Sequence, residues 1–244
     1  MATLLKRLWL LGLALAVACG DSSPPKITAP SLTSITVTGS DLIIVGQSET
    51  FTAVGNTGAP LSTVWWGTDA PAIVTVDPYG GPVTAVGVGT ATIFVDSGGV
   101  RGTKTIRTLP NFTGTWKGLY EETGCETTGD WAALRVCSDS PYDLGIAEMT
   151  MTLTQNRDAV SGSFTLLGRR GPGGPLSGRV ASDGTLTFAG TAPGPVVNVE
   201  LQNVRFETPQ KHEMTGTFEQ LYSATGRSGM YRVFARLREM RSFD

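Results

Sequence analysis

Histidine is nearly missing from this 244-residue chain, in which His212 is the single example. One imidazole excludes a metal site built on paired histidines and a mechanism that passes a proton between two histidines. The nucleophile sequence Gly-x-Ser-x-Gly does not occur among the many serines, so a serine hydrolase has no support either. We therefore expect a protein that is not an enzyme, with no catalytic residues, no cofactor and no metal.

Charge is also scarce and balanced, since 16% of the residues are charged and the formal net charge is -2. Nucleic-acid-binding proteins carry a basic excess on one face, and this chain has none. No stretch sustains helical periodicity over three turns, whereas apolar residues often alternate with Thr and Ser. The sequence therefore predicts an all-β protein whose partners do not include nucleic acid.

One apolar run, Leu8 to Val17, follows the positive residues Lys6 and Arg7. It is too short to cross a bilayer, which takes ~20 apolar residues. A basic flank before a short apolar core is the layout of a secretory signal, and we assign residues 1–18 to it.

Residues 16–20 (AVACG) resemble the lipobox of bacterial lipoproteins, in which small residues precede a cysteine. The resemblance implies cleavage after residue 18, a lipid on Cys19, and a Ser- and Pro-rich tether over residues 19–30. Asp directly after the cysteine tends to hold such lipoproteins at the inner membrane. Gly20 stands there instead, which implies an outer-membrane location. The alternative is an ordinary signal peptide in which Cys19 is incidental.

The chain has three cysteines, and Cys125 and Cys137 lie close enough in sequence to pair within one domain. Pairing is the default in an oxidising envelope, and it leaves Cys19 over for lipid. The bridged insert would lie at one end of the second domain. It is either a lid that carries Glu122, Glu126 and Trp131 to a ligand, or a stapled surface loop.

Short alternating runs between turn residues predict a β-sandwich over residues 31–108. Residues 66–69 (WGTD), 74–77 (VTVD) and 81–93 (GPVTAVGVGTATI) resemble the bacterial immunoglobulin-like group 2 (BIG2) family. That resemblance implies an immunoglobulin-like spacer or adhesive module without a catalytic site, with Trp66 in its core. For Trp65, packing against a neighbour is favoured over a ligand-stacking role.

A five-residue pattern, large apolar then Ser or Thr, Gly, any residue, large apolar, occurs four times in the C-terminal half. At strand spacing the apolar residues and the glycine share one face, where the glycine allows a sheet to bend sharply. Residues 111–244 are thus predicted to form an eight-stranded antiparallel up-and-down β-barrel. A slip in the alternation predicts a β-bulge at Gln202 and Asn203. The pattern occupies residues 112–116, 160–164, 176–180 and 214–218, and the strands are expected at 112–121, 146–155, 159–167, 175–181, 185–190, 196–206, 211–221 and 229–239.

The sequence Gly114-Thr115-Trp116 on the first of these strands, with arginines on the last, is similar to the calycin pattern of lipocalins and avidins. The resemblance implies that Trp116 closes one end of the barrel and that an arginine packs over it, with Arg232, Arg236 and Arg238 as candidates. The other sequence motifs of lipocalins are absent, so the resemblance does not imply a lipocalin ligand for this chain.

This organisation predicts a lipid-anchored bacterial cell-envelope protein in which the first domain is a spacer and the barrel binds a small apolar ligand or a glycan. The alternative is a structural, adhesive or inhibitor-type protein with a filled barrel that binds macromolecules, such as a surface protein, through its loops. The residues expected to point inward are bulky, which favours a filled barrel because eight strands leave an interior that side chains can just fill. They are Met149, Met151, Phe164, Leu166, Phe188, Met214 and Phe218.

Overall fold

The structure is a computed structural model that describes residues 31–80, 82–138, 145–167 and 173–243. The expected leader, the lipid-bearing Cys19 and the tether lie outside the described residues and stay predictions. Within the described ranges nearly all regular structure is β-strand, and the single helix is α1 (Asp130–Ala133). No helix among those residues has the length and apolarity needed to cross a membrane.

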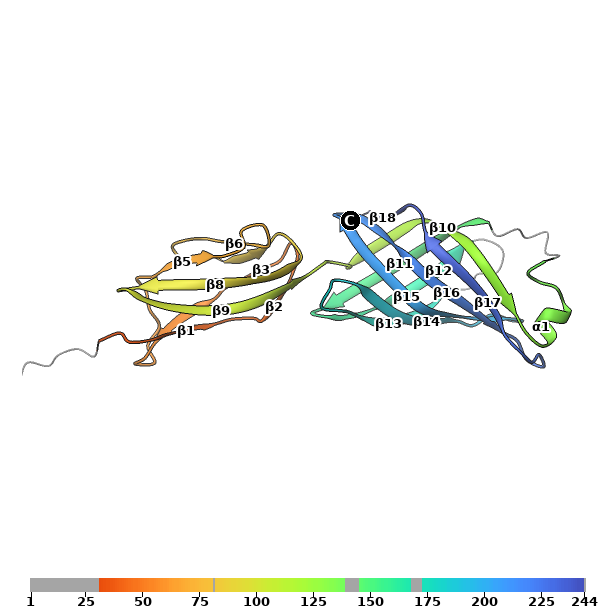
Figure 1. The fold of residues 1–244 in the computed structure, drawn as a ribbon, viewed down its shortest axis with the longest axis horizontal. Coiled ribbons are helices and arrows are strands. Elements are labelled where there is room, and N and C mark those ends of the chain that lie inside the picture. The colour runs from red at the N-terminus through yellow and green to blue at the C-terminus, as the bar shows by residue number, and fades with distance from the viewer. Residues whose placement is uncertain (1–30, 81, 139–144, 168–172, 244) are drawn as a thin grey trace, which may run out of the picture. The chain divides into compact units, whose positions relative to one another are not determined.

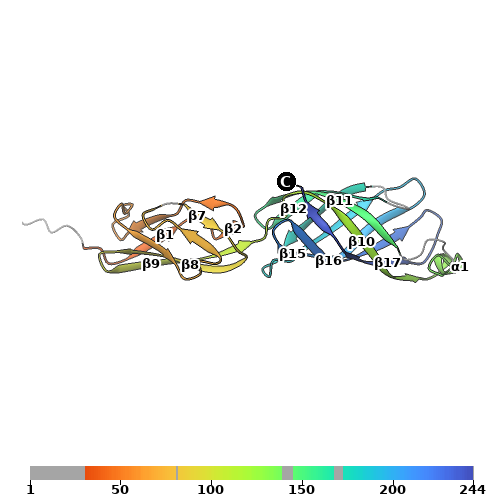
Figure 2. The same ribbon diagram turned by 90° about the horizontal axis from the view of Figure 1, so that it is seen from above.

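The N-terminal strands form three small sheets that share one apolar core. The sheets are β1 with β4, β2-β9-β8-β5, and β3-β7-β6, and β2 runs parallel to β9 (Figure 2). Trp66 lies in the core as expected, whereas Trp65 packs its ring on Phe94 but stays 47% exposed. The strands are β1 (Ile35–Thr38), β2 (Leu42–Ile44), β3 (Ser48–Glu49), β4 (Thr52–Gly55), β5 (Trp65–Thr68), β6 (Val74–Val76), β7 (Val83–Ala85), β8 (Gly89–Ser97) and β9 (Val100–Leu109).

The C-terminal half is a closed eight-stranded antiparallel barrel, as predicted (Figure 1). Each strand pairs with the next in sequence, and the last, β17, returns to pair with β10 and close the barrel. A short extra strand, β18, pairs with β10 and β16 and was not expected. The strands are β10 (Gly114–Thr127), β11 (Ile146–Asn156), β12 (Ala159–Leu167), β13 (Gly173–Val180), β14 (Leu186–Ala192), β15 (Asn198–Gln210), β16 (Glu213–Ser223), β17 (Tyr231–Leu237) and β18 (Met240–Ser242).

The recurrent glycines sit where neighbouring strands come too close for any side chain. A Cβ on Gly162 would collide with the backbone carbonyl of Thr152, and one on Gly216 would collide with that of Arg205. A glycine at such a position lets the backbones approach, which favours the strong coiling that a small barrel needs. The repeated pattern therefore encodes curvature, as its spacing suggested.

Bulky apolar side chains fill the described interior of the barrel. All seven residues expected to point inward are buried. Phe206 packs edge-to-face on Phe188 and Phe218, with ring centroids 5.4 and 6.0 Å apart, and Tyr120 meets Phe218 at 5.4 Å. Such ring contacts add to the stabilisation from burial itself.

Candidate functional site

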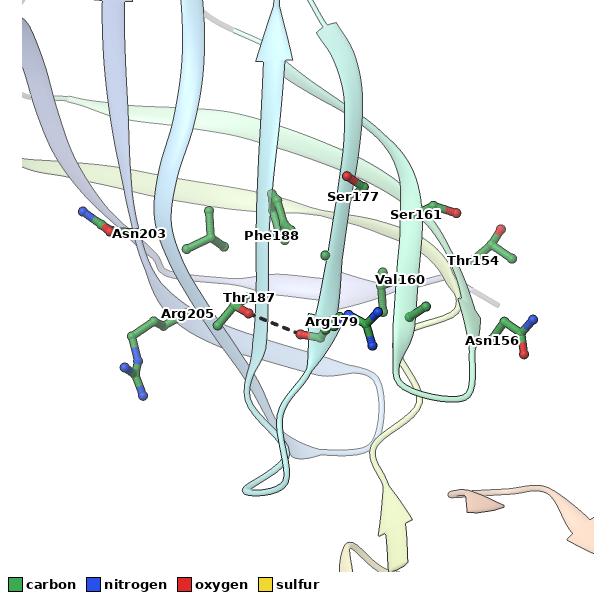
Figure 3. Close-up of a pocket in the computed structure, with 13 residues that line it drawn as sticks. Thr154, Asn156, Val160, Ser161, Ser177, Arg179, Thr187, Phe188, Asn203 and Arg205 are labelled. Atoms are coloured by element: carbon green, nitrogen blue, oxygen red, sulfur yellow. Dashed lines mark hydrogen bonds between the residues drawn. The ribbon is translucent and has the colours of Figure 1, made fainter. Parts of the chain in front are cut away.

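A hollow of about 930 Å³ lies on the outer surface of the barrel, across strands β11 to β15 (Figure 3). Its lining is mixed: hydroxyl, amide and guanidinium side chains face outward together with Ala159, and apolar atoms contribute more of the exposed lining surface than polar atoms do. The larger apolar residues that contribute to it, such as Phe188, are buried core residues. The lining residues are Thr154, Asn156, Ala159, Val160, Ser161, Ser177, Gly178, Arg179, Thr187, Phe188, Asn203, Val204 and Arg205.

Strand alternation explains the outward polar groups of the hollow. Val160 and Phe188 point into the core, so their neighbours Ser161 and Thr187 point outward. Between them, Gly178 pairs with both Val160 and Phe188 and therefore lies on the inward-facing row, so that only its backbone contributes to the floor of the hollow. The outward hydroxyls therefore surround that floor.

A β-bulge in β15 supplies the last wall of the hollow. Gln202 pairs with Glu219 while Arg205 pairs with Thr217, so β15 carries one residue more than its partner strand. Asn203 takes a positive φ of 48° at this point. The predicted bulge is thus confirmed, and bulges commonly re-aim side chains. Because the extra residue reverses the inward and outward alternation of side chains along β15, Val204 is buried while Asn203 and Arg205 face outward.

The two cations of the hollow lie near carboxylates. Arg179 forms an ion pair with Asp158, with 2.8 Å between the guanidinium nitrogen and the carboxylate oxygen, and this hydrogen bond holds the pKa of Asp158 below its ordinary value. The pKa of Asp183 is lowered mainly by hydrogen bonds from Thr185, and the charge of Arg205 adds to that shift. The charge of Arg179 is therefore balanced by a carboxylate in contact with it, whereas Arg205 makes only the smallest contribution to the pKa of Asp183.

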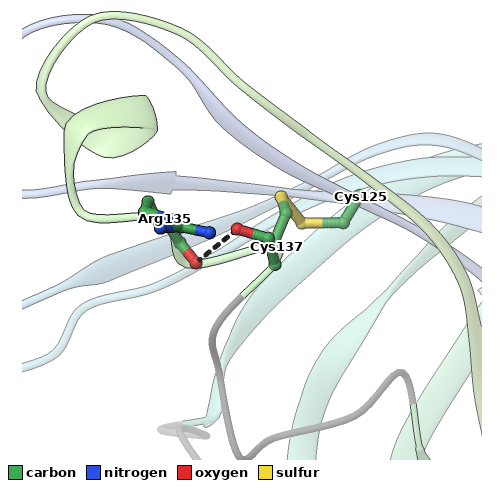
Figure 4. Close-up of a disulfide and its surroundings, with 4 residues drawn as sticks. Cys125, Arg135 and Cys137 are labelled. Atoms are coloured by element: carbon green, nitrogen blue, oxygen red, sulfur yellow. Dashed lines mark hydrogen bonds between the residues drawn. A yellow bond between two sulfur atoms is a disulfide. The ribbon is translucent and has the colours of Figure 1, made fainter.

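The insert that was expected to be either a lid or a stapled surface loop carries the expected disulfide, and its tryptophan is buried. Cys125 and Cys137 form a disulfide beside α1 (Figure 4). Trp131 is only 5% exposed, and its ring lies 5.4 Å from that of Tyr231. Glu126 is exposed to solvent. Trp131 and Glu126 are thus not presented together on one surface, and Glu122, on the same strand as Glu126, is only partly exposed.

One polar side chain in the barrel interior is incompletely satisfied. Gln220 is fully buried, and its Oε1 accepts a hydrogen bond of 2.6 Å from the Tyr222 hydroxyl. Its Nε2 has no hydrogen-bond partner among the described residues. The pKa of the nearby Tyr120 is raised to about 12, mainly by burial and secondly by the charge of Glu122, while Gln220 acts in the opposite direction.

Trp116 is buried, and its indole Nε1 donates a 2.8 Å hydrogen bond to the carbonyl of Phe112. Arg232 and Arg236 alternate with buried residues of β17, so they lie on the outer face. Arg236 is hydrogen-bonded to Glu121, which lowers the pKa of that carboxyl, and Arg232 lies 3.3 Å from Glu219. Arg238 is exposed and lies 3.9 Å from the same Glu121, so each of the three candidate arginines lies near a carboxylate, and the packing of one over Trp116 stays a prediction.

The single histidine and the acidic residues do not form a further site among the described residues. His212 pairs with Ser242 through its Nδ1 at 2.6 Å, at a turn. Over the described ranges, no three His, Cys, Asp or Glu residues come together as metal ligands would. Sequence reasoning missed the hollow, and the one available signal was the slip at Gln202, which changes the face on which Asn203 and Arg205 lie.

No protein-family model and no curated protein sequence matches the chain. Two solved structures show a distant likeness. The crystal structure of the S-layer protein rSbsC is 12% identical with a TM-score of 0.28, and the match covers 82% of this chain and 38% of that one. The structure of surface layer protein SbsC, domains 4-9, is 14% identical with a TM-score of 0.27, covering 87% and 46%. The chain thus spans less than half the length of these proteins, and scores this low carry no argument about function.

Proposed function

We propose that this protein is a non-enzymatic, lipid-anchored protein of the bacterial envelope, in which an immunoglobulin-like spacer carries a filled β-barrel that binds a neutral glycan in its outer hollow. The outward hydroxyl, amide and guanidinium groups of that hollow, set in a lining that also exposes apolar surface, are the observation that supports the proposal. Glycans present closely spaced hydroxyls that both donate and accept hydrogen bonds. Ser161, Ser177 and Thr187 offer the same dual chemistry, and Asn203 adds an amide.

The charge balance supports a neutral ligand over a polyanion. Arg179 already shares its charge with Asp158, with which it forms an ion pair at 2.8 Å. A polyanion would have to compete with this carboxylate. A neutral hydroxyl would instead find guanidinium N–H donors, which form strong, directional hydrogen bonds.

The filled interior supports binding at the outer surface. The rings of Phe188, Phe206 and Phe218 contact one another in the core, and Met149 and Met151 are fully buried. An apolar ligand of ordinary size would have to displace several of these close-packed side chains.

The envelope location rests on sequence features, with one structural observation beside them. Residues 1–18 have the layout of a leader, and Cys19 follows small residues as in a lipobox. The disulfide between Cys125 and Cys137 fits an oxidising compartment. Metabolic labelling with a palmitate analogue tests the anchor, because the wild-type protein should carry label that a Cys19→Ala variant loses.

Calorimetric titration of the intact protein with cellotetraose, chitotetraose and maltotetraose tests the glycan. A Ser177→Trp substitution places a large ring in the hollow and should weaken binding about tenfold or more. Ser223→Trp is the matched control, because Ser223 is an exposed residue of β16 that does not line the hollow. Binding that is equal in the two variants, or absent in the wild type, contradicts the proposal.

The incompletely satisfied Gln220 favours a second candidate function, the binding of a small molecule inside the barrel beneath Trp131. Such a ligand would accept a hydrogen bond from Gln220 Nε2, because a buried donor without a partner costs free energy. Native mass spectrometry of the protein from its own host distinguishes the two functions. A stoichiometric extra mass that a Gln220→Leu variant loses supports the interior ligand, whereas a bare mass contradicts a tightly held one.

A further inference from the structure

We infer that the N-terminal domain carries a second, independent carbohydrate site on the exposed face of the sheet β2-β9-β8-β5, centred on the indole of Trp65. Trp65 is 47% exposed although Trp66 beside it is buried. A large exposed indole on a regular strand is costly in water and presents an apolar surface to a ligand.

The indole is held in place by its neighbours. The Trp65 and Phe94 rings lie 5.6 Å apart, and the guanidinium carbon of Arg101 lies 4.4 Å from the centroid of Phe94. Gly67 makes this arrangement possible, because a Cβ there would collide with the Phe94 ring and lie 3.1 Å from the Trp65 ring. The platform of Trp65, Phe94, Arg101 and Asp96 is therefore ordered before a ligand arrives.

Polar groups stand next to the aromatic surface. Asp96 pairs with Trp65 across strands and accepts two hydrogen bonds from Arg101, of 2.8 and 2.6 Å. These bonds use two of the five N–H donors of the guanidinium, and both side chains are partly exposed. The pair can therefore donate to and accept from hydroxyl groups at the edge of the indole.

A pyranose ring fits these features better than a protein does. One side of many pyranoses is a flat array of C–H groups that stacks on an aromatic ring, while the equatorial hydroxyls point sideways. The surroundings of the platform are polar, with Thr103 opposite Phe94 and Thr105 one step further along β9. A protein interface would instead surround its aromatic anchors with a desolvated apolar core. The geometry therefore points to a neutral, pyranose-containing oligosaccharide as the ligand, with the C–H face of one sugar ring stacked on the indole of Trp65.

Nuclear magnetic resonance of the intact protein in detergent micelles tests this site with cellotetraose, chitotetraose and maltotetraose. The indole N–H signal of Trp65 is assigned by its loss in Trp65→Ala. We expect that signal to shift and saturate, and Trp65→Ala to weaken binding at this site about tenfold or more. Gly67→Ala should also weaken binding, because the new methyl group displaces the Phe94 and Trp65 rings.

Tyr79→Ala is the matched control, since Tyr79 is an exposed aromatic of the same domain, 89% accessible, and should leave the affinity unchanged. A stationary Trp65 signal at saturating sugar overturns the inference, as does wild-type affinity at this site in Trp65→Ala. Ser177→Trp separates this site from the barrel hollow. If the Trp65 signal of the Ser177→Trp variant still shifts on addition of sugar, the Trp65 site is supported independently of the hollow. If, in addition, no signal of the hollow shifts in the wild type, the proposed function of the barrel is contradicted.

Discussion

Replacing Phe218 by alanine tests whether the barrel interior is solidly packed. Phe218 is 1% exposed, and its ring packs edge-to-face against those of Tyr120 and Phe206. In a filled barrel the substitution removes a buried ring and leaves a cavity that its neighbours can only partly close. In a hollow barrel the ring would line existing space, and its loss would create little new cavity.

The expected loss of stability for the filled barrel is about 4 kcal/mol, the middle of the range for a phenylalanine truncated in a packed core. For an m-value of about 2 kcal/mol per molar urea, this corresponds to a shift of roughly 2 M in the unfolding midpoint. Equilibrium urea denaturation should be followed by pulsed hydrogen exchange and mass spectrometry, because peptides of β15 to β17 then report on the barrel separately from the N-terminal domain.

Ile146→Ala is the matched control, since Ile146 is an apolar residue of the same barrel that is 56% exposed. Its unfolding midpoint should lie within about 0.3 M of the wild type. A Phe218→Ala shift no larger than that of the control would refute the reasoning, because it would mean that the interior at Phe218 is not close-packed.

Three further predictions concern the barrel. Gly162→Ala should lower the melting temperature by several degrees, since the added methyl group collides with the carbonyl of the adjacent strand, and an unchanged melting curve would count against the close approach. Replacing Cys125 and Cys137 by serine should cost about 3 kcal/mol in the chain-entropy account of a 12-residue separation, and urea midpoints of oxidised and variant protein measure it. The hydrogen bond from Arg236 lowers the folded-state pKa of Glu121, so its contribution to stability is present above the unfolded value of about 4.3 and is lost as pH falls through the lower folded value. Melting temperatures of Glu121→Gln from pH 7 to acid should therefore fall less steeply than those of the wild type, and parallel curves would contradict this assignment.

Much of the barrel could be predicted because strand alternation has a period of two. Phe164 and Phe218 follow that period without interruption, so their inward direction was readable directly. Even the bulge in β15 left a trace, because an extra residue reverses the alternation after Gln202. The glycine pattern likewise reported backbone approach, which only a missing side chain allows.

The hollow could not be predicted, because it depends on which residues stand opposite one another across five strands. Ser161 lies beside Ser177 only in the observed register, which the turn geometries and the bulge determine together. Trp131 shows a second limit. Polar residues precede it and apolar ones follow it in the sequence, yet its ring is buried against Tyr231, and local composition does not report such a tertiary contact.

Trp65 shows a third limit. Alternation places Trp65 and Trp66 on opposite faces, but it does not say whether both faces are covered. The structure packs one side of the Trp65 ring on Phe94 and leaves about half of the side chain exposed, as the proposed platform requires.

The most direct test of the account follows backbone amide and arginine side-chain signals of the intact protein, by nuclear magnetic resonance, during titration with the tightest-binding of the three tetrasaccharides. The account predicts shifts of the Arg179 and Arg205 side-chain signals and of the amides of Ser177 and Thr187, while Gln220 is unaffected. Shifts at Gln220 with no change at the two arginines would contradict it, because the ligand would then lie inside the barrel.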